Sequence, residues 1–187
     1  MKRFYSFLQR RKFKKIGVDV FIDERAYFRY PERVVIGSHC AFDNGLHMTC
    51  AAIIGSYVHI GPHVSIIGGK DSALEMGDFS TIAAGARVIC RGERHLGAGL
   101  IGPTIPSQFK DELVGGRVLI QPFANILTNA VLFPGFVIGE GAVIGAGSVL
   151  NHDAEPWTVY LGNPARKIKL RDPEVMRLFS EKIGLKK

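Results

Sequence analysis

The apolar residues of this chain recur every six positions over most of its length. In residues 137–150, VIGEGAVIGAGSVL, nearly the same hexad occurs twice in succession. An α-helix repeats every 3.6 residues and a β-strand every two, so neither explains a period of six. Large apolar residues open successive hexads at Ile22, Phe28, Ile36, Phe42, Met48, Ile54, Ile60, Ile66, Met76, Ile82, Val88, Ile120, Ile126, Leu132, Ile138, Ile144 and Leu150.

A second regularity accompanies the first. The fourth residue after the apolar one is small in most hexads, as at Cys40, Ala124, Ala142 and Ser148. A fixed short period is typical of repeat folds, and a period of six indicates a parallel β-helix. Each circuit would contain three short strands and three turns, with the large residue pointing into the lumen and the small one at the corner. The sequence therefore predicts an all-β fold.

The pattern also divides the chain. Residues 17–156 form the predicted β-helix, interrupted by a loop excursion at 94–118 where no hexad can be recognised. Residues 1–16 are predicted to form a basic N-terminal helix. Residues 157–187 form a C-terminal extension with a short helix, for which Asp172 is the expected cap and Pro173 suits the first helical position.

The positive net charge of the chain limits the kinds of binding partner that we expect. The net charge is +7, and seven of the 24 Lys and Arg residues lie in the first fifteen positions. A basic protein can bind nucleic acid, an anionic membrane or a phosphorylated small molecule. We expect no nucleic-acid binding, because no recognisable reading module is present. The basic N-terminal helix either caps the open end of the β-helix or touches a membrane surface.

The remaining composition points to a cytoplasmic enzyme or scaffold. No apolar run approaches the roughly 18 residues that span a bilayer, and no apolar stretch of a secretory signal is present. The three cysteines contain no CxxC motif, which favours reduced thiols. The histidines are scattered over outward positions and do not stack, so no metal site is predicted.

The off-period loop is the best candidate for a reaction centre, since long loops in compact domains are often functional. It begins beside Glu93, Arg94 and His95, three titratable side chains in a row. A neutral imidazole can accept a proton near pH 7. Standard nucleotide, hydrolase and zinc-protease motifs are absent from the chain.

The segment from Val118 to Arg171, with IGAGSV and GNPARKI near its end, resembles the hexapeptide-repeat acyltransferases that fold as a left-handed β-helix. The resemblance is strongest to the sugar O-acetyltransferases and the nucleotide-sugar N-acyltransferases. It implies a homotrimer that uses acetyl-CoA or another acyl-CoA, without a metal. By position, Thr128, Ala146 and Asn151 would line the pantetheine arm, and Arg166 and Lys169 would meet the nucleotide phosphates.

The resemblance also suggests roles in the reaction. His95 occupies the place of the family's catalytic base, and Glu93 is a candidate to orient it. Glu75, Asp78 and Ser80 are candidates for binding the acceptor. The amino-sugar subgroup can hold an aspartate at the loop position, so a histidine there favours a hydroxyl acceptor without deciding between O- and N-acylation.

The expected function is that of a CoA-dependent acyltransferase modifying a hydroxyl or amino group of a sugar or nucleotide-sugar in surface polysaccharide biosynthesis. Two alternatives stay open. One is a non-catalytic β-helix scaffold or subunit. The other is an acetyltransferase acting on a non-sugar acceptor such as an antibiotic.

Overall fold

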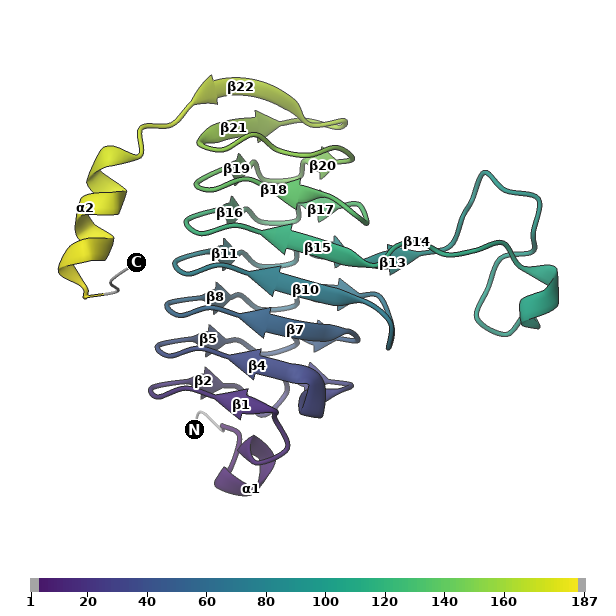
Figure 1. Cartoon of the computed structure of the whole chain (residues 1–187), viewed down its shortest axis with the longest axis horizontal. Coiled ribbons are helices and arrows are strands. Elements are labelled where there is room, and N and C mark those ends of the chain that lie inside the picture. The colour runs from purple at the N-terminus through teal and green to yellow at the C-terminus, as the bar shows by residue number, and fades with distance from the viewer. Residues whose placement is uncertain (1–3, 185–187) are drawn as a thin grey trace.

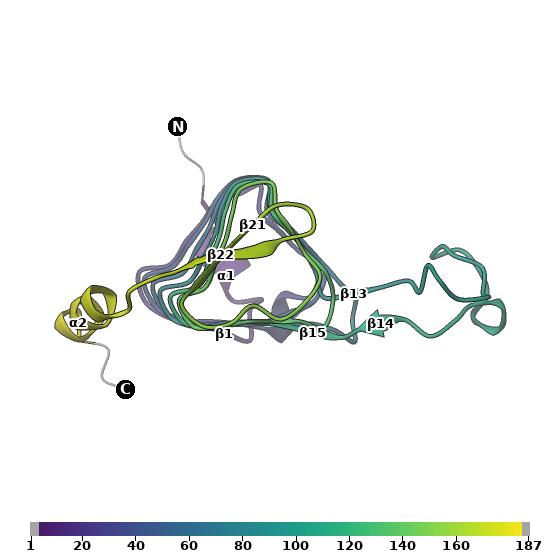
Figure 2. The same ribbon diagram turned by 90° about the horizontal axis from the view of Figure 1, so that it is seen from above.

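The structure is a computed structural model that describes residues 4–184. The chain winds into a triangular prism whose sides are three parallel sheets (Figures 1 and 2). The first sheet contains β1 (Lys15–Ile16), β4 (Val34–Ile36), β7 (Ala51–Ile54), β10 (Ala73–Met76), β15 (Arg117–Ile120) and β18 (Val137–Ile138). The second contains β2 (Phe21–Ile22), β5 (Ala41–Phe42), β8 (His59–Ile60), β11 (Thr81–Ile82), β16 (Asn125–Ile126), β19 (Val143–Ile144), β21 (Thr158–Leu161) and β22 (Arg166–Leu170).

The third sheet contains β3 (Tyr27–Phe28), β6 (His47–Met48), β9 (Ser65–Ile67), β12 (Arg87–Ile89), β17 (Val131–Leu132) and β20 (Val149–Leu150). Successive strands visit the three sheets in turn, so each strand pairs with the one a circuit later. Ile126, for example, pairs with Ile82 on one side and Ile144 on the other. The predicted left-handed β-helix is confirmed.

The lumen holds the large residues of the hexads. None of the seventeen predicted inward positions is more than 7% exposed, and most are fully buried. The small residues of the corners, including Cys40, Ala124 and Ser148, are buried as well. The period of six therefore does build the core. All three cysteines are free and buried.

The corner between the first and second sheets has an unusual backbone. His39, Tyr57, Phe79, Phe123 and Trp157, which we call the aromatic ladder, all have positive φ between 53° and 62°. Their rings follow one another along the corner at centroid separations of 4.6–5.9 Å. L-residues rarely adopt positive φ. Each residue of the aromatic ladder has such a φ and carries an aromatic ring that contacts a ring of the adjacent coil.

The N-terminal segment differs from the sequence prediction. Only α1 (Phe7–Arg10) is helical within the described part of residues 1–16, and β1 is already the first strand of the prism. The backbone N–H of Tyr5 donates to the carbonyl of Ile22 at 2.9 Å. The Phe13 ring is buried and lies 4.9 Å from the Phe28 ring. The segment thus covers the N-terminal end of the prism, which supports the capping alternative (Figure 1).

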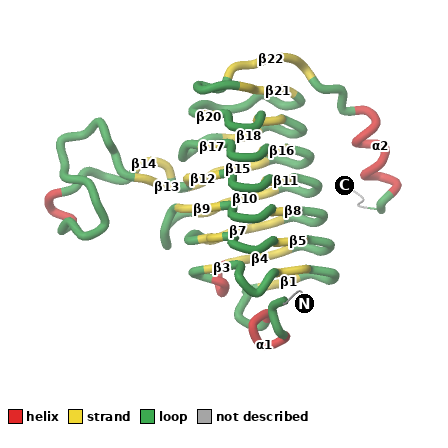
Figure 3. Tube along the Cα trace, turned by 180° about the vertical axis from the view of Figure 1, so that it is seen from behind, coloured by secondary structure: helices red, strands yellow, loops and turns green. Residues whose placement is uncertain are grey.

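At the other end the β-helix continues beyond the predicted boundary at residue 156. β21 pairs in parallel with β19, and β22 turns back antiparallel across the end of the prism. The chain then descends beside the prism as α2 (Glu174–Lys182) (Figures 1 and 3). Asp172 accepts a hydrogen bond from the N–H of Glu174 at 2.9 Å, close to its predicted capping role. No helix in residues 4–184 is long and apolar enough to cross a membrane.

Candidate functional site

The off-period segment forms an arm that leaves the prism. β13 (Arg91–Gly92) and β14 (Val114–Gly115) pair antiparallel and carry the intervening residues away from the corner between the third and first sheets (Figures 1 and 2). We call residues 93–113 the arm. It contains one short 3-10 helix, Ser107–Phe109. The hexads resume at β15, slightly earlier than predicted.

The arm is fastened by polar contacts of its own. Lys110 Nζ donates to Glu93 Oε1 at 2.7 Å and to the carbonyl of Gly102 at 2.9 Å. Asp111 Oδ2 accepts from the N–H of Gly99 at 2.8 Å. The hydrogen bond from Lys110 lowers the pKa of the Glu93 carboxyl. Glu93 is therefore ionised at neutral pH and engaged by a lysine, whereas the sequence had assigned it to His95.

His95 itself is exposed on the arm. Its neighbours in the arm include apolar side chains that also face solvent, with Leu96 fully exposed and Leu100 and Phe109 more than half exposed. An exposed apolar cluster of this kind typically marks a contact surface.

The predicted cofactor residues occupy three different places. Thr128 and Ala146 lie on the corner between the second and third sheets, one circuit apart. There the N–H of Gly147 donates to the Thr128 carbonyl at 2.9 Å. Asn151 follows β20 and lies on the corner from which the arm departs. Arg166 and Lys169 are exposed on β22.

A groove includes one of these residues, Lys169. It runs along the outer face of the second sheet beside β22 and is lined by Asn125, Leu127, Val143, Val159, Lys169, Leu170 and Arg171. Aliphatic side chains form its floor and two cations stand at its wall. Burial lowers the pKa of Arg171, whose guanidinium donates to the Gly141 carbonyl at 3.2 Å. Of the groove residues, sequence reasoning identified only Lys169 as a site residue. Asn125, Leu127 and Val143 occupy outward positions of the hexads, which was the available signal, whereas Val159, Leu170 and Arg171 follow the last hexad.

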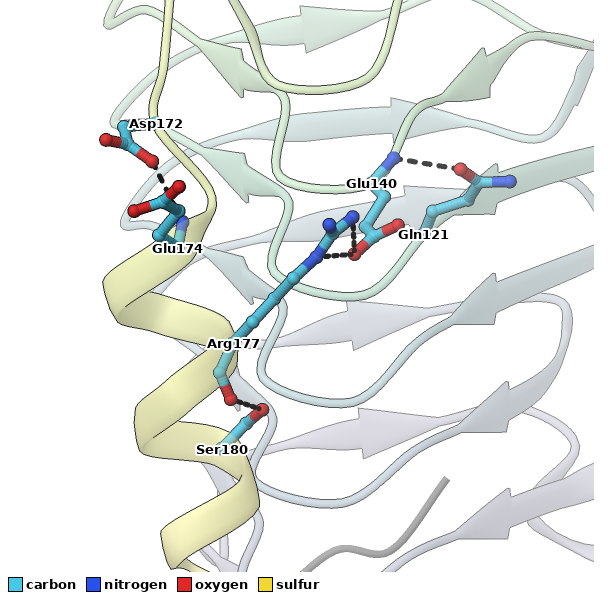
Figure 4. A network of polar contacts seen from close by, with 6 residues as sticks. All are labelled: Gln121, Glu140, Asp172, Glu174, Arg177 and Ser180. Carbon is cyan, nitrogen blue, oxygen red and sulfur yellow. Dashed lines mark hydrogen bonds and ion pairs between the residues drawn. The ribbon is translucent and has the colours of Figure 1, made fainter.

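A second hollow continues this groove under α2. It shares Asn125 and Arg171 with the groove and is otherwise lined by Phe79, Phe123, Met176, Phe179, Ser180 and Ile183. Arg177 of this helix donates to Glu140 Oε1 at 3.1 Å (Figure 4). Its guanidinium also lies over the ring of Trp157, so the helix is held against the aromatic ladder. Gln121 Oε1 in turn accepts from the backbone N–H of Glu140 at 2.8 Å.

The predicted acceptor residues do not converge. Glu75 on β10 pairs with Arg117 on the adjacent strand. Asp78 Oδ1 accepts from the N–H of Ser56 at 2.6 Å and so fastens two coils together. Ser80 is fully buried, and its hydroxyl donates to the Gly77 carbonyl at 2.7 Å. The Ser80 hydroxyl thus faces the interior of its own chain and lies away from the outer surface of the prism.

Metal-ligating side chains do not gather anywhere in residues 4–184. No three His, Cys, Asp or Glu side chains there come close enough to hold an ion. The His–Asp contacts that do occur, His39 with Asp19 and His59 with Asp43, are single pairs at 2.9 Å on the surface.

Known proteins place the chain in a family. No model of a protein family matches the chain. It is 30% identical over 172 residues to the dTDP-4-amino-4,6-dideoxy-D-glucose acyltransferase of Escherichia coli, a match covering 90% of this chain and 88% of that one. It is 34% identical over 131 residues to a probable macrolide acetyltransferase of Lysinibacillus sphaericus, covering 62% and 68% of the two chains.

Solved structures agree. The N-acyltransferase AntD from Bacillus cereus, in complex with dTDP and 3-hydroxybutyryl-CoA, has a TM-score of 0.91 and 33% identity over 98% of this chain and 97% of that one. An AntD variant in complex with dTDP-4-amino-4,6-dideoxyglucose and coenzyme A matches equally well, over 98% of both chains. The chain therefore belongs to the acyl-CoA-dependent hexapeptide-repeat acyltransferases, alongside the acyltransferases of dTDP-linked amino sugars.

Proposed function

We propose that this enzyme transfers the acyl group of an acyl-CoA to the amino group of a nucleotide-linked amino-deoxy sugar, of the kind used to build surface polysaccharide. The observation that carries the proposal is the match to AntD over 98% of both chains, because AntD was crystallised with dTDP-4-amino-4,6-dideoxyglucose and coenzyme A. The macrolide acetyltransferase matches over only 62% of this chain. We therefore propose an amine as the acceptor, in place of the hydroxyl that His95 had favoured in the sequence analysis.

The groove beside β22 suits the co-substrate. Its aliphatic floor of Leu127, Val143 and Val159 fits the pantetheine arm, and Lys169 and Arg171 at its wall fit the phosphates. Cations recognise phosphate oxygens through charge-assisted hydrogen bonds. Arg171 thereby joins the cofactor residues inferred from the sequence.

His95 acts as the base of the reaction. The amine nitrogen forms a bond to the thioester carbonyl carbon, and the C–S bond then breaks. The nitrogen must lose a proton and the CoA sulfur gains one. A neutral imidazole can carry that proton, a role typically contributing 10²–10⁴-fold in rate.

Each active site needs two copies of the chain. The arm with His95 leaves one corner of the prism, whereas β22 and α2 leave a different one (Figure 2). The imidazole and the cationic groove of a single chain therefore cannot enclose one substrate. The exposed apolar residues of the arm support its insertion against a neighbouring prism. In a closed homotrimer, every arm would meet the groove of a neighbouring copy.

The test is release of free CoA thiol from acetyl-CoA or 3-hydroxybutyryl-CoA in the presence of dTDP-4-amino-4,6-dideoxyglucose, with chloramphenicol as the hydroxyl control. We expect turnover with the amino sugar alone. His95→Asn should lower kcat at least about 100-fold without changing calorimetric binding of acetyl-CoA. His47→Asn, which alters an exposed histidine on β6, is the matched control.

Sharing of the site between copies is tested by mixing. His95→Asn and Lys169→Ala chains are unfolded together and refolded, so that mixed oligomers form. Some interfaces then combine an intact arm with an intact groove, and activity should return well above that of either variant. Mixed oligomers without activity would rule out a shared site. Turnover of chloramphenicol in place of the amino sugar would contradict the acceptor class.

A further inference from the structure

The charge of residues 4–184 is unevenly distributed along the prism. Residues 4–33 contain eight Lys and Arg against four Asp and Glu, a net charge of +4. Residues 34–184 contain twelve against thirteen, a net charge of −1. Since the chain climbs the prism from one end to the other, this asymmetry in sequence is an asymmetry in space (Figure 1).

The basic residues sit on a rigid support. The segment that carries them is fastened to the first coil by the buried Phe13 and by Tyr5, whose hydroxyl donates to the Ala26 carbonyl. Backbone hydrogen bonds add to this, such as that from the N–H of Lys14 to the Pro31 carbonyl at 3.2 Å. The cations therefore form a fixed surface, which we call the basic end.

The cations of the basic end are poorly neutralised. Lys12, Lys14 and Lys15 are exposed, and none forms an ion pair with any residue in the range 4–184. Of the four acids, Asp19 pairs with His39 and Asp23 with Arg25, so neither of these two neutralises the three lysines.

Apolar side chains of the same segment are also exposed. Phe4 is 44% exposed and Val18 69% exposed. The combination of lysines with exposed apolar groups suits the boundary between lipid headgroups and acyl chains. A single-stranded nucleic acid would require exposed rings for stacking. Val18 is aliphatic and offers no ring, whereas Phe4 and Tyr27 are 44% and 48% exposed, so nucleic acid is the alternative that the test must exclude.

We propose that the basic end docks the enzyme on an anionic lipid bilayer, with the prism axis pointing away from the membrane. The arm and the groove beside β22 lie on later coils, away from this end (Figure 1). Docking therefore leaves the catalytic apparatus accessible to soluble substrates, and membrane binding and acyl transfer are separable. The inference does not depend on the identity of the acceptor.

Co-sedimentation with lipid vesicles tests the proposal. The full chain should bind vesicles of phosphatidylcholine with phosphatidylglycerol at low salt, bind pure phosphatidylcholine at least tenfold more weakly, and dissociate at high salt. Each neutralised lysine should weaken binding about fivefold, so Lys12→Gln with Lys14→Gln should lose about thirtyfold. Lys167→Gln with Lys182→Gln removes the same charge away from the basic end, on β22 and α2, and should leave binding within about twofold.

Three outcomes overturn the proposal. One is absence of binding to anionic vesicles at low salt. Another is an equal loss in both double variants, which would indicate a nonspecific response to net charge. The third is tighter binding to single-stranded RNA or duplex DNA than to vesicles at the same salt. Unchanged acyl transfer and melting temperature in the two double variants verify that they are folded.

Discussion

The position of α2 depends on a single glycine of the corner beneath it. Gly141 has φ +64°, and a Cβ there would lie 2.3 Å from the Trp157 ring. The Trp157 ring packs over this glycine. Its centroid lies 5.9 Å from the centroid of the Phe123 ring and 5.1 Å from the guanidinium carbon of Arg177. Gly141→Ala should therefore displace the ring and loosen the helix.

Gly147 provides a matched comparison. It has φ +67° on a neighbouring corner, but nothing lies within 4 Å of its would-be Cβ. Gly147→Ala should cost only the left-handed conformation of an L-residue, about 1–2 kcal/mol. Gly141→Ala adds the strain of overpacking, about 1–3 kcal/mol, and weakens a cation–π contact worth about 0.5–1 kcal/mol. The difference between the two variants should be about 2–4 kcal/mol.

The assay is denaturant unfolding followed by circular dichroism and by tryptophan fluorescence. Trp157 is the only tryptophan of the chain, so its emission reports on this corner. Both signals are needed because repeat folds can unfold in parts. In a Trp157→Leu background the extra cost of Gly141→Ala should vanish. Equal losses for Gly141→Ala and Gly147→Ala, or a penalty that persists without the indole, would refute the reasoning.

Further variants test three other features of the structure. Lys110→Met should return the pKa of Glu93 from its lowered value toward the ordinary carboxyl value, seen by carboxyl NMR titration. Because the folded pKa is lowered, the pair stabilises the arm above the ordinary pKa, and this stabilisation is lost as pH falls through the lowered value. Ile126→Ala should cost about 2–5 kcal/mol in denaturant unfolding, whereas Leu127→Ala, at an outward position, should cost under about 1 kcal/mol. Arg177→Ala should speed amide exchange in α2 severalfold while leaving the melting temperature nearly unchanged, since exposed ion pairs contribute little to global stability.

Sequence reasoning could have gone further than it did at one point. Ser80 is the fourth residue after Met76, the small corner position of its own hexad. The repeat rule already placed such residues at the tight corners, as it did for Ala124 and Ser148, and the structure buries all three. Assigning Ser80 to the acceptor site disregarded that rule. Likewise, Asn151 follows Ala146 by five residues, so the two could not share a corner in a fold that turns every six.

Other features had no local signal. The partner of Glu93 is Lys110, seventeen positions away, and only the folding of the arm decides that pairing. Arg171 belongs to the groove because β22 reverses direction across the end of the prism. The N-terminal segment contained basic and apolar residues compatible with a long helix, yet packing of Phe13 onto the first coil limits α1 to four residues.

The sequence by itself determined the β-helix, the residues of its interior and the place where the coil is interrupted. Each hexad specifies one strand and one turn, and the stacked coils repeat this short-range pattern. It also determined the family through IGAGSV and GNPARKI. Only the tertiary structure decided which corner carries the arm, where β22 and α2 lie, and which outward residues share a groove. Those relations join residues many circuits apart, and no short-range period records them.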